Sequence, residues 1–150
     1  MRVFVQRVSE ASVAVDNEIC SEIGCGVLIL LGIENTDNVE DINWLCSKIA
    51  KLRIFPDAEG IMNLSLMEKK GEALVVSQFT LHASTKKGNR PSYIKAARPE
   101  VARPLYKDFV YRLTQVLGKK VETGKFGADM KVSLINDGPV SIWIDSKSKE

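Results

Sequence analysis

The side chains best suited to chemistry lie in residues 75–84, which read VVSQFTLHAS. Ser77 and Thr80 offer hydroxyl groups, and His82 is the one histidine of the chain. In a serine hydrolase, a histidine removes the proton from the nucleophilic hydroxyl and a carboxylate orients that histidine. The segment therefore suggests ester hydrolysis, provided that the chain supplies a base.

The spacing within this segment argues against such a triad. The apolar run before it predicts a strand, in which Thr80 and His82 face one side and Ser77 faces the other. The chain also lacks the G-x-S-x-G sequence of a nucleophile elbow. We therefore expect His82 to take no part in catalysis. The alternative is that Gln78 and Thr80 merely point into water at a sheet edge.

Cysteine and metal chemistry have no support in the sequence. Cys20, Cys25 and Cys46 form no C-x-x-C pair, and no histidine lies near any of them. A single histidine cannot complete the usual zinc spacings. We expect reduced thiols, no metal and no cofactor.

A second unusual segment is NDGPVS, residues 136–141. Its simplest interpretation is a turn between two apolar strands. However, two-residue hairpins favour Asn-Gly or Asp-Gly without a following proline. Gly138 has no side chain and Pro139 has no N–H, so the pair presents two bare carbonyl groups. A rigid pair of carbonyls is suited to act as a steric barrier.

Alternation of apolar residues predicts most of the strands that must position these segments. Two strands joined by a short turn are expected within residues 3–15, and another over 19–23. The run VLILLGI, residues 27–33, is apolar on both faces and predicts a central strand. Residues 120–145 are expected to supply three closing strands.

Apolar residues three or four positions apart predict two helices. The first follows Thr36 or Asp37 as its cap. The second covers residues 99–117, and its buried face is expected to carry Val101, Leu105, Phe109 and Leu113. The sequence thus predicts one α/β domain over residues 1–150. It is strand-rich, with mixed, largely antiparallel sheets, two packed helices and a flexible tail at 146–150.

Composition favours a globular protein with one locally basic surface. Of the 150 residues, 45% are hydrophobic and 27% charged, which excludes a disordered chain. We identify no secretory signal and no apolar run long enough to span a bilayer, so a cytoplasmic location is expected. The net charge is +2, but residues 82–103 carry six cations and one carboxylate, or +5, which leaves −3 elsewhere. This asymmetry predicts contact with a polyanion rather than only a solvated surface, through Lys86, Lys87, Arg90, Lys95, Arg98 and Arg103.

Six segments, in this order, resemble the D-aminoacyl-tRNA deacylases, which are also called D-tyrosyl-tRNA deacylases. They are MRVFVQRVSEASVAVD, LRIFPD, LVVSQFTL, TKKGNRPS, VETGKFGADMKVSL and NDGPVSIWID. The resemblance extends from Met1 to Asp145. Ser141 departs from it by replacing the usual threonine, although the hydroxyl is retained.

The resemblance implies hydrolysis of the ester between tRNA and a D-amino acid, or glycine mischarged on tRNA(Ala). The 2′-hydroxyl of the terminal adenosine helps to activate water, so that no protein base is required. The implied catalytic residues are Ser77, Gln78, Phe79 and Thr80. Amide groups near Phe79 and Thr80 are expected to hold the developing oxyanion.

The resemblance also implies a homodimer whose site is completed by the partner subunit. Gly138 and Pro139 form a cis peptide that enters the partner's pocket and rejects L-amino acids. Arg7 holds this motif, and Phe126 and Met130 line the pocket. Lys86, Lys87 and Arg90 are the expected tRNA contacts. Two alternatives remain: a related deacylase with a trans Gly-Pro that acts on small L-aminoacyl-tRNAs, and a tRNA-binding module without turnover.

Overall fold

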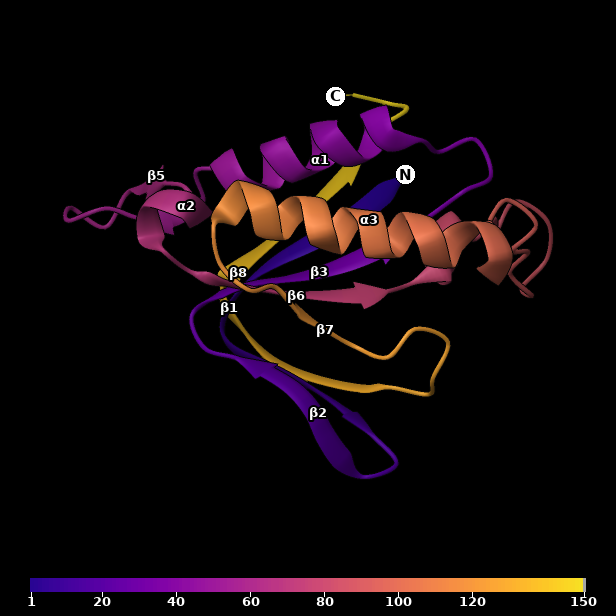
Figure 1. Cartoon of the computed structure of the whole chain (residues 1–150), viewed down its shortest axis with the longest axis horizontal. Helices are drawn as coiled ribbons and strands as arrows, with labels where there is room; N and C mark the ends of the chain where they lie inside the picture. Colours follow the sequence, from indigo (N-terminus) through magenta and orange to yellow (C-terminus); the bar gives the residue numbers. More distant parts are fainter. Residues whose placement is uncertain (150) are drawn as a thin grey trace.

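One long strand, β1 (Arg2–Val15), organises the sheet of the computed structural model, which describes residues 1–149 (Figure 1). The other strands of this sheet are β2 (Glu18–Ile23), β3 (Gly26–Gly32), β6 (Glu72–Ser77), β7 (Glu122–Thr123) and β8 (Lys131–Asp145). Along one edge, β1 pairs with β3 and then with β2, and β8 pairs with its other edge, all antiparallel. The β3–β6 and β6–β7 pairs are parallel. The predicted mixed, largely antiparallel α/β fold is therefore confirmed.

Two long helices, α1 (Val39–Lys51) and α3 (Pro99–Leu117), lie side by side over one face of the sheet (Figure 1). The cap of α1 is Asn38 rather than Thr36 or Asp37, because its side chain accepts a hydrogen bond of 2.8 Å from the backbone amide of Glu40. The bounds of α3 agree with the prediction. Its buried face agrees at Phe109 and Leu113. It differs at the start of the helix, where Ala102 and Tyr106 point inward and Val101 is 40% exposed.

Short elements connect α1 to β6. They are β4 (Phe55–Pro56), β5 (Met62–Leu64) and α2 (Leu66–Lys69). The main core lies between the helices and the sheet, and it includes Val5, Ile29, Leu45, Phe109 and Leu113. A smaller core on the other side of the sheet includes Val8, Leu28, Leu74 and Val76. The central strands are thus covered on both faces, as the apolar run in β3 predicted.

The two turns predicted in residues 3–15 and 136–141 do not form. β1 is continuous, and β8 runs through Asn136 and Pro139 without reversing. Gln6 pairs with Ser141 and Val8 with Asn136, so four residues of β8 bulge out opposite Arg7 alone. The Asn136 side chain holds this bulge by accepting a hydrogen bond of 2.7 Å from the backbone amide of Val140.

The polar segment after β6 is not a strand. β6 ends at Ser77, and η1 (Phe79–His82) is a 3₁₀ turn closed by a bond from Ala83 N to the Thr80 carbonyl at 3.0 Å. Gly32 permits this close approach, because a Cβ there would lie 2.9 Å from the Leu81 Cβ. The predicted alternation of faces was therefore wrong, and His82 points inward, where it is 1% exposed.

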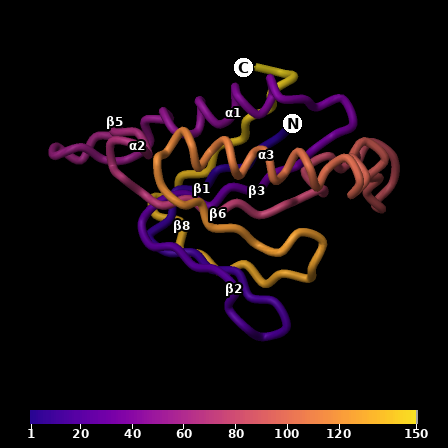
Figure 2. The backbone as a smooth tube through the Cα atoms, viewed as in Figure 1, coloured from indigo at the N-terminus to yellow at the C-terminus, as the bar shows by residue number. Residues whose placement is uncertain are grey.

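The two ends of the chain lie close together beside α1 (Figure 2). Ser146 is buried, and its hydroxyl accepts from the amino group of Met1 at 3.0 Å. Lys147 pairs with Asp41 at 2.8 Å. The start of the expected flexible tail is thus packed on the fold, while Glu150 lies outside the described residues. Within residues 1–149, no helix has the length and apolar character needed to cross a membrane.

Candidate active site

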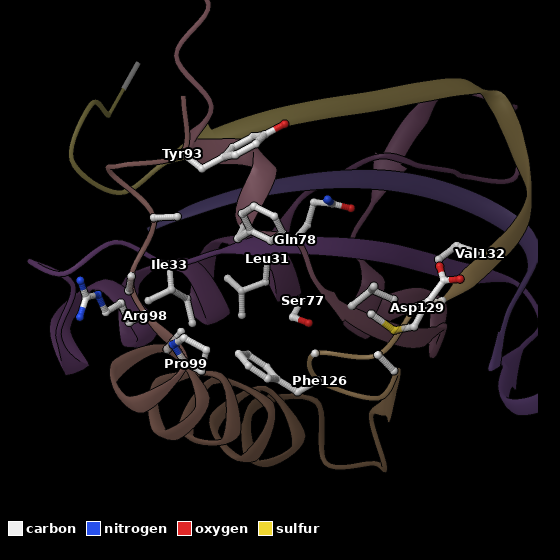
Figure 3. A pocket seen from close by; sticks show the side chains of 18 residues that line it. Leu31, Ile33, Ser77, Gln78, Tyr93, Arg98, Pro99, Phe126, Asp129 and Val132 are labelled. Atoms are coloured by element: carbon white, nitrogen blue, oxygen red, sulfur yellow. The ribbon is translucent and has the colours of Figure 1, made fainter. Parts of the chain in front are cut away.

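A cavity of about 580 Å³ lies between η1, the start of α3 and the segment that leads into β8 (Figure 3). Ser77, Gln78 and Phe79 border it on one side, and Phe126 and Met130 border it on another. Most of the remaining wall is apolar: Leu31, Ile33, Val76, Ala97, Ala102 and Val132. Five of the predicted pocket residues therefore meet at one concave, largely apolar site, whereas Thr80, which was predicted with them, does not line it.

The turn η1, whose Phe79 lines this cavity, has two backbone amides without a hydrogen-bond partner among the described residues. Gln78 anchors the start of the turn, since its amide donates to the Leu31 carbonyl at 2.8 Å. The amides of Phe79 and Thr80 precede the first amide that donates a hydrogen bond within the turn. No side chain of the described residues caps them. The Gln78 side chain donates to the Thr80 hydroxyl and fixes its position. Two adjacent amides of this kind can stabilise a negatively charged oxygen.

Among the described residues, no histidine is positioned to act as a general base beside these amides. His82 belongs to the same turn but is buried, and both of its ring nitrogens lack hydrogen-bond partners among the described residues. Burial lowers the pKa of His82, which favours the neutral imidazole. That His82 takes no part in catalysis stays a prediction, and the sequence did not predict its burial.

Two reactive side chains of the main core, Tyr106 and Cys46, and one carboxylate at the cavity are also unsuited to act as a base or nucleophile. The Tyr106 hydroxyl donates to the Val75 carbonyl at 2.8 Å, and burial raises its pKa. Burial raises the pKa of Cys46 to about 12, which keeps its thiol protonated. Asp129 is the one carboxylate that lines the cavity, and it is exposed and paired with Lys131 at 3.0 Å. The site thus combines uncapped backbone amides with an apolar chamber, and none of the described residues that line it is positioned as a general base.

The wall opposite η1 is held by aromatic and small residues. Phe126 packs against Tyr106 with 5.5 Å between ring centroids, and the guanidinium of Arg103 lies 5.1 Å from the Phe126 ring. Met130 packs over Gly124, where a Cβ would lie 2.6 Å from its sulfur. Glycine at position 124 therefore allows Met130 to reach the cavity wall.

Gly138 and Pro139 form a second cluster, which does not line the cavity of their own chain. Both are exposed on the β8 bulge, and the peptide bond between them is cis. Arg7 lies directly beneath the bulge. Its Nε donates to the Asp137 carbonyl at 2.8 Å and its Nη1 to the Ile54 carbonyl at 2.6 Å. The expected contact between Arg7 and this motif is therefore present.

The basic loop forms a hairpin beside the cavity mouth. Ser84 and Ser92 exchange backbone hydrogen bonds of 2.8 and 2.9 Å, and Lys86, Lys87 and Arg90 are exposed beyond this pair. Tyr93 follows at once, and its ring packs edge-on against Phe79 with centroids 5.1 Å apart. Tyr93 and Arg98 line the cavity but were not predicted as pocket residues, because they belong to a loop without periodic pattern.

Comparison with known proteins gives consistent results. The family described as D-Tyr-tRNA(Tyr) deacylase matches residues 4–145. The chain is 66% identical to the D-aminoacyl-tRNA deacylase of Flavobacterium psychrophilum and 63% identical to that of Bacteroides fragilis, with all of each sequence covered.

Two solved structures are also similar. The c-Myc DNA unwinding element binding protein is 41% identical, with a TM-score of 0.92 over 97% of this chain and 98% of the other. A probable eukaryotic D-amino acid tRNA deacylase is 18% identical, with a TM-score of 0.82 over 95% and 97%, and at that identity the likeness concerns the fold.

Proposed function

This chain belongs to the D-Tyr-tRNA(Tyr) deacylase family, and from that premise we propose that it hydrolyses the ester of D-aminoacyl-tRNA. The products are the free D-amino acid and the tRNA. Glycine mischarged on tRNA(Ala) is a second substrate in this proposal. An enzyme with these substrates works where translation takes place, which supports the expected cytoplasmic location.

The observation that carries the proposal is the pair of amides at Phe79 and Thr80, uncapped by any described side chain, in a turn whose Phe79 lines an apolar chamber. When water attacks the ester, the carbonyl oxygen becomes an oxyanion, and these amides are available to bind it. Donors of this kind contribute about 3–4 kcal/mol to transition-state stabilisation. Gln78 and Thr80, already bonded to each other, would orient the terminal adenosine.

In this proposal the substrate itself activates the water, which is supported by the lack of a positioned base among the described residues that line the cavity. The 2′-hydroxyl of the terminal adenosine is adjacent to the ester in every aminoacyl-tRNA, so binding the substrate brings it to the site. The protein then contributes shape, orientation and oxyanion donors. This division of labour fits a cavity whose one carboxylate, Asp129, is exposed and paired with a lysine.

Selection against L-amino acids is assigned to Gly138 and Pro139 of a partner subunit in a two-fold homodimer. The pair is exposed, lies outside its own cavity and is held by Arg7. Rigid carbonyl groups placed in the partner's cavity would collide with an L side chain, whereas a D side chain points elsewhere. Glycine has no side chain to reject and would be accepted.

The experiment that tests the proposal compares matched D- and L-tyrosyl-tRNA. We expect release of D-tyrosine and almost none of L-tyrosine, and glycyl-tRNA(Ala) should also be hydrolysed. Preferential release of L-alanine from L-alanyl-tRNA would instead indicate the related deacylase for small L-amino acids. Tight, salt-sensitive tRNA binding without release of any amino acid would indicate a binding module.

A further inference from the structure

Tyr93 is an aromatic side chain at the cavity that the proposed chemistry does not use. Its residue is 39% exposed, and it lines the cavity from the loop side. The ring meets Phe79 at an interplanar angle of 76°. In Figure 3 the hydroxyl points away from Ser77, and it makes no hydrogen bond to another described residue. What Tyr93 offers at this position is the surface of its ring.

The surroundings of this ring are strongly cationic. Tyr93 follows the Ser84–Ser92 pair that closes the basic hairpin, so the ring and the exposed hairpin cations belong to one loop. Lys95 and Arg98 follow within five positions, and no acidic residue occurs between Ala73 and Pro99. An exposed aromatic ring next to unpaired cations is the usual contact surface for single-stranded nucleic acid, in which bases stack and phosphates pair with cations.

We propose that Tyr93 stacks on the base of the nucleotide that precedes the terminal adenosine of the unpaired acceptor end. The inference rests on the proposed function, which places the ester at Phe79 and Thr80 and the terminal nucleoside in the cavity. The strand must then leave the cavity at its mouth. Tyr93 lies there, between the oxyanion donors and the hairpin cations that can take the next phosphates.

The test compares two substrates, of which only the first contains this nucleotide. D-tyrosyl-tRNA carries it, and D-tyrosyl-adenosine, the ester of adenosine alone, does not. We expect Tyr93→Ala to lower kcat/KM on the tRNA ester about tenfold, mainly through KM. The loss on the adenosine ester should be at least fivefold smaller. Tyr93→Phe keeps the ring and should recover most of the loss, and Tyr111→Ala, which alters an exposed tyrosine on α3, is the matched control.

A third variant separates stacking from packing on Phe79. Tyr93→Leu keeps an apolar side chain against Phe79 but removes the aromatic face, so it should resemble the alanine variant. The inference is overturned if leucine restores activity, if both substrates lose activity equally, or if the alanine variant retains its KM for tRNA. If the unaltered protein releases D-tyrosine from neither ester, then the proposed function itself has failed.

Discussion

At Phe79, the backbone amide and the side chain can be tested separately. Phe79→Pro removes the N–H at the first position of a 3₁₀ turn, where proline is well tolerated, and Gln78 before it is not helical (φ −145°, ψ 84°). Phe79→Ala removes only the ring. Relative to alanine, we expect proline to lower kcat by about 10²–10³ with D-tyrosyl-tRNA, because one oxyanion donor is lost. Equal kcat values for the two variants would show that this amide does not bind the oxyanion.

His82 should influence stability rather than chemistry. Its pKa is lowered by burial, so as the pH falls through about 6.5 the unfolded chain takes up a proton before the folded chain does. Stability should therefore fall as the pH drops from 7.5 to 5.5, by up to about 1.4 kcal/mol per pH unit from this group. Urea unfolding at several pH values measures the slope, and His82→Ala should reduce it.

The same His82→Ala variant tests whether the histidine is a catalyst. The ring does not line the cavity, so the hydrolysis rate at neutral pH should stay within a few-fold of the original. The overall stability of the variant should be lower, because the substitution leaves a space in a buried site. A hundredfold loss of kcat in a folded variant would show that His82 acts in the reaction.

At the scale of elements, local periodicity was sufficient where an element's own residues determine its structure. The apolar run of β3 and the apolar stripes of α1 and α3 were found in this way. The 3₁₀ turn was missed because Gly32, on another strand, provides the space it needs. The β8 bulge was missed because Arg7, on β1, holds it from the opposite strand.

The candidate site was predictable only in part for the same reason. Resemblance to a family identified the SQFT and Gly-Pro segments, and the structure brings all of the first segment except Thr80 to a cavity with Phe126 and Met130. Tyr93 and Arg98 line that cavity because of the path taken by an irregular loop, whose sequence has no periodic pattern. The sequence thus pointed to several residues of the cavity but not to all the residues that form its wall.

The basic hairpin should account for a measurable part of tRNA binding. Lys86 and Arg90 are exposed and have no carboxylate partner among the described residues. If each contacts one phosphate, the slope of log K against log salt should become shallower by about one for each substitution to alanine. Lys120, which is exposed and pairs with Glu122, serves as the control substitution. An unchanged slope in Lys86→Ala and Arg90→Ala would place the phosphate contacts elsewhere.

For the whole molecule, the proposal requires that each site uses the Gly-Pro bulge of the other subunit. Gly138 has φ +142°, and a Cβ there would lie 2.7 Å from Val140 Cγ2 and 3.0 Å from Arg7 Nη2. Gly138→Ala should therefore displace the bulge and weaken the rejection of L-amino acids. We expect hydrolysis of L-tyrosyl-tRNA to rise about tenfold, which corresponds to about 1.4 kcal/mol of lost discrimination.

A mixed dimer then shows which subunit supplies the bulge. One subunit carries Gly138→Ala, the other carries Phe79→Pro, and two different affinity tags isolate the heterodimer. Its one competent cavity belongs to the Gly138→Ala subunit, and an intact bulge is present only on the partner. If the bulge acts across the interface, the heterodimer should reject L-tyrosyl-tRNA as well as the unaltered protein does. If it acts within one chain, the heterodimer should keep about half of the L-tyrosine release of the Gly138→Ala homodimer, since one of two equivalent sites remains.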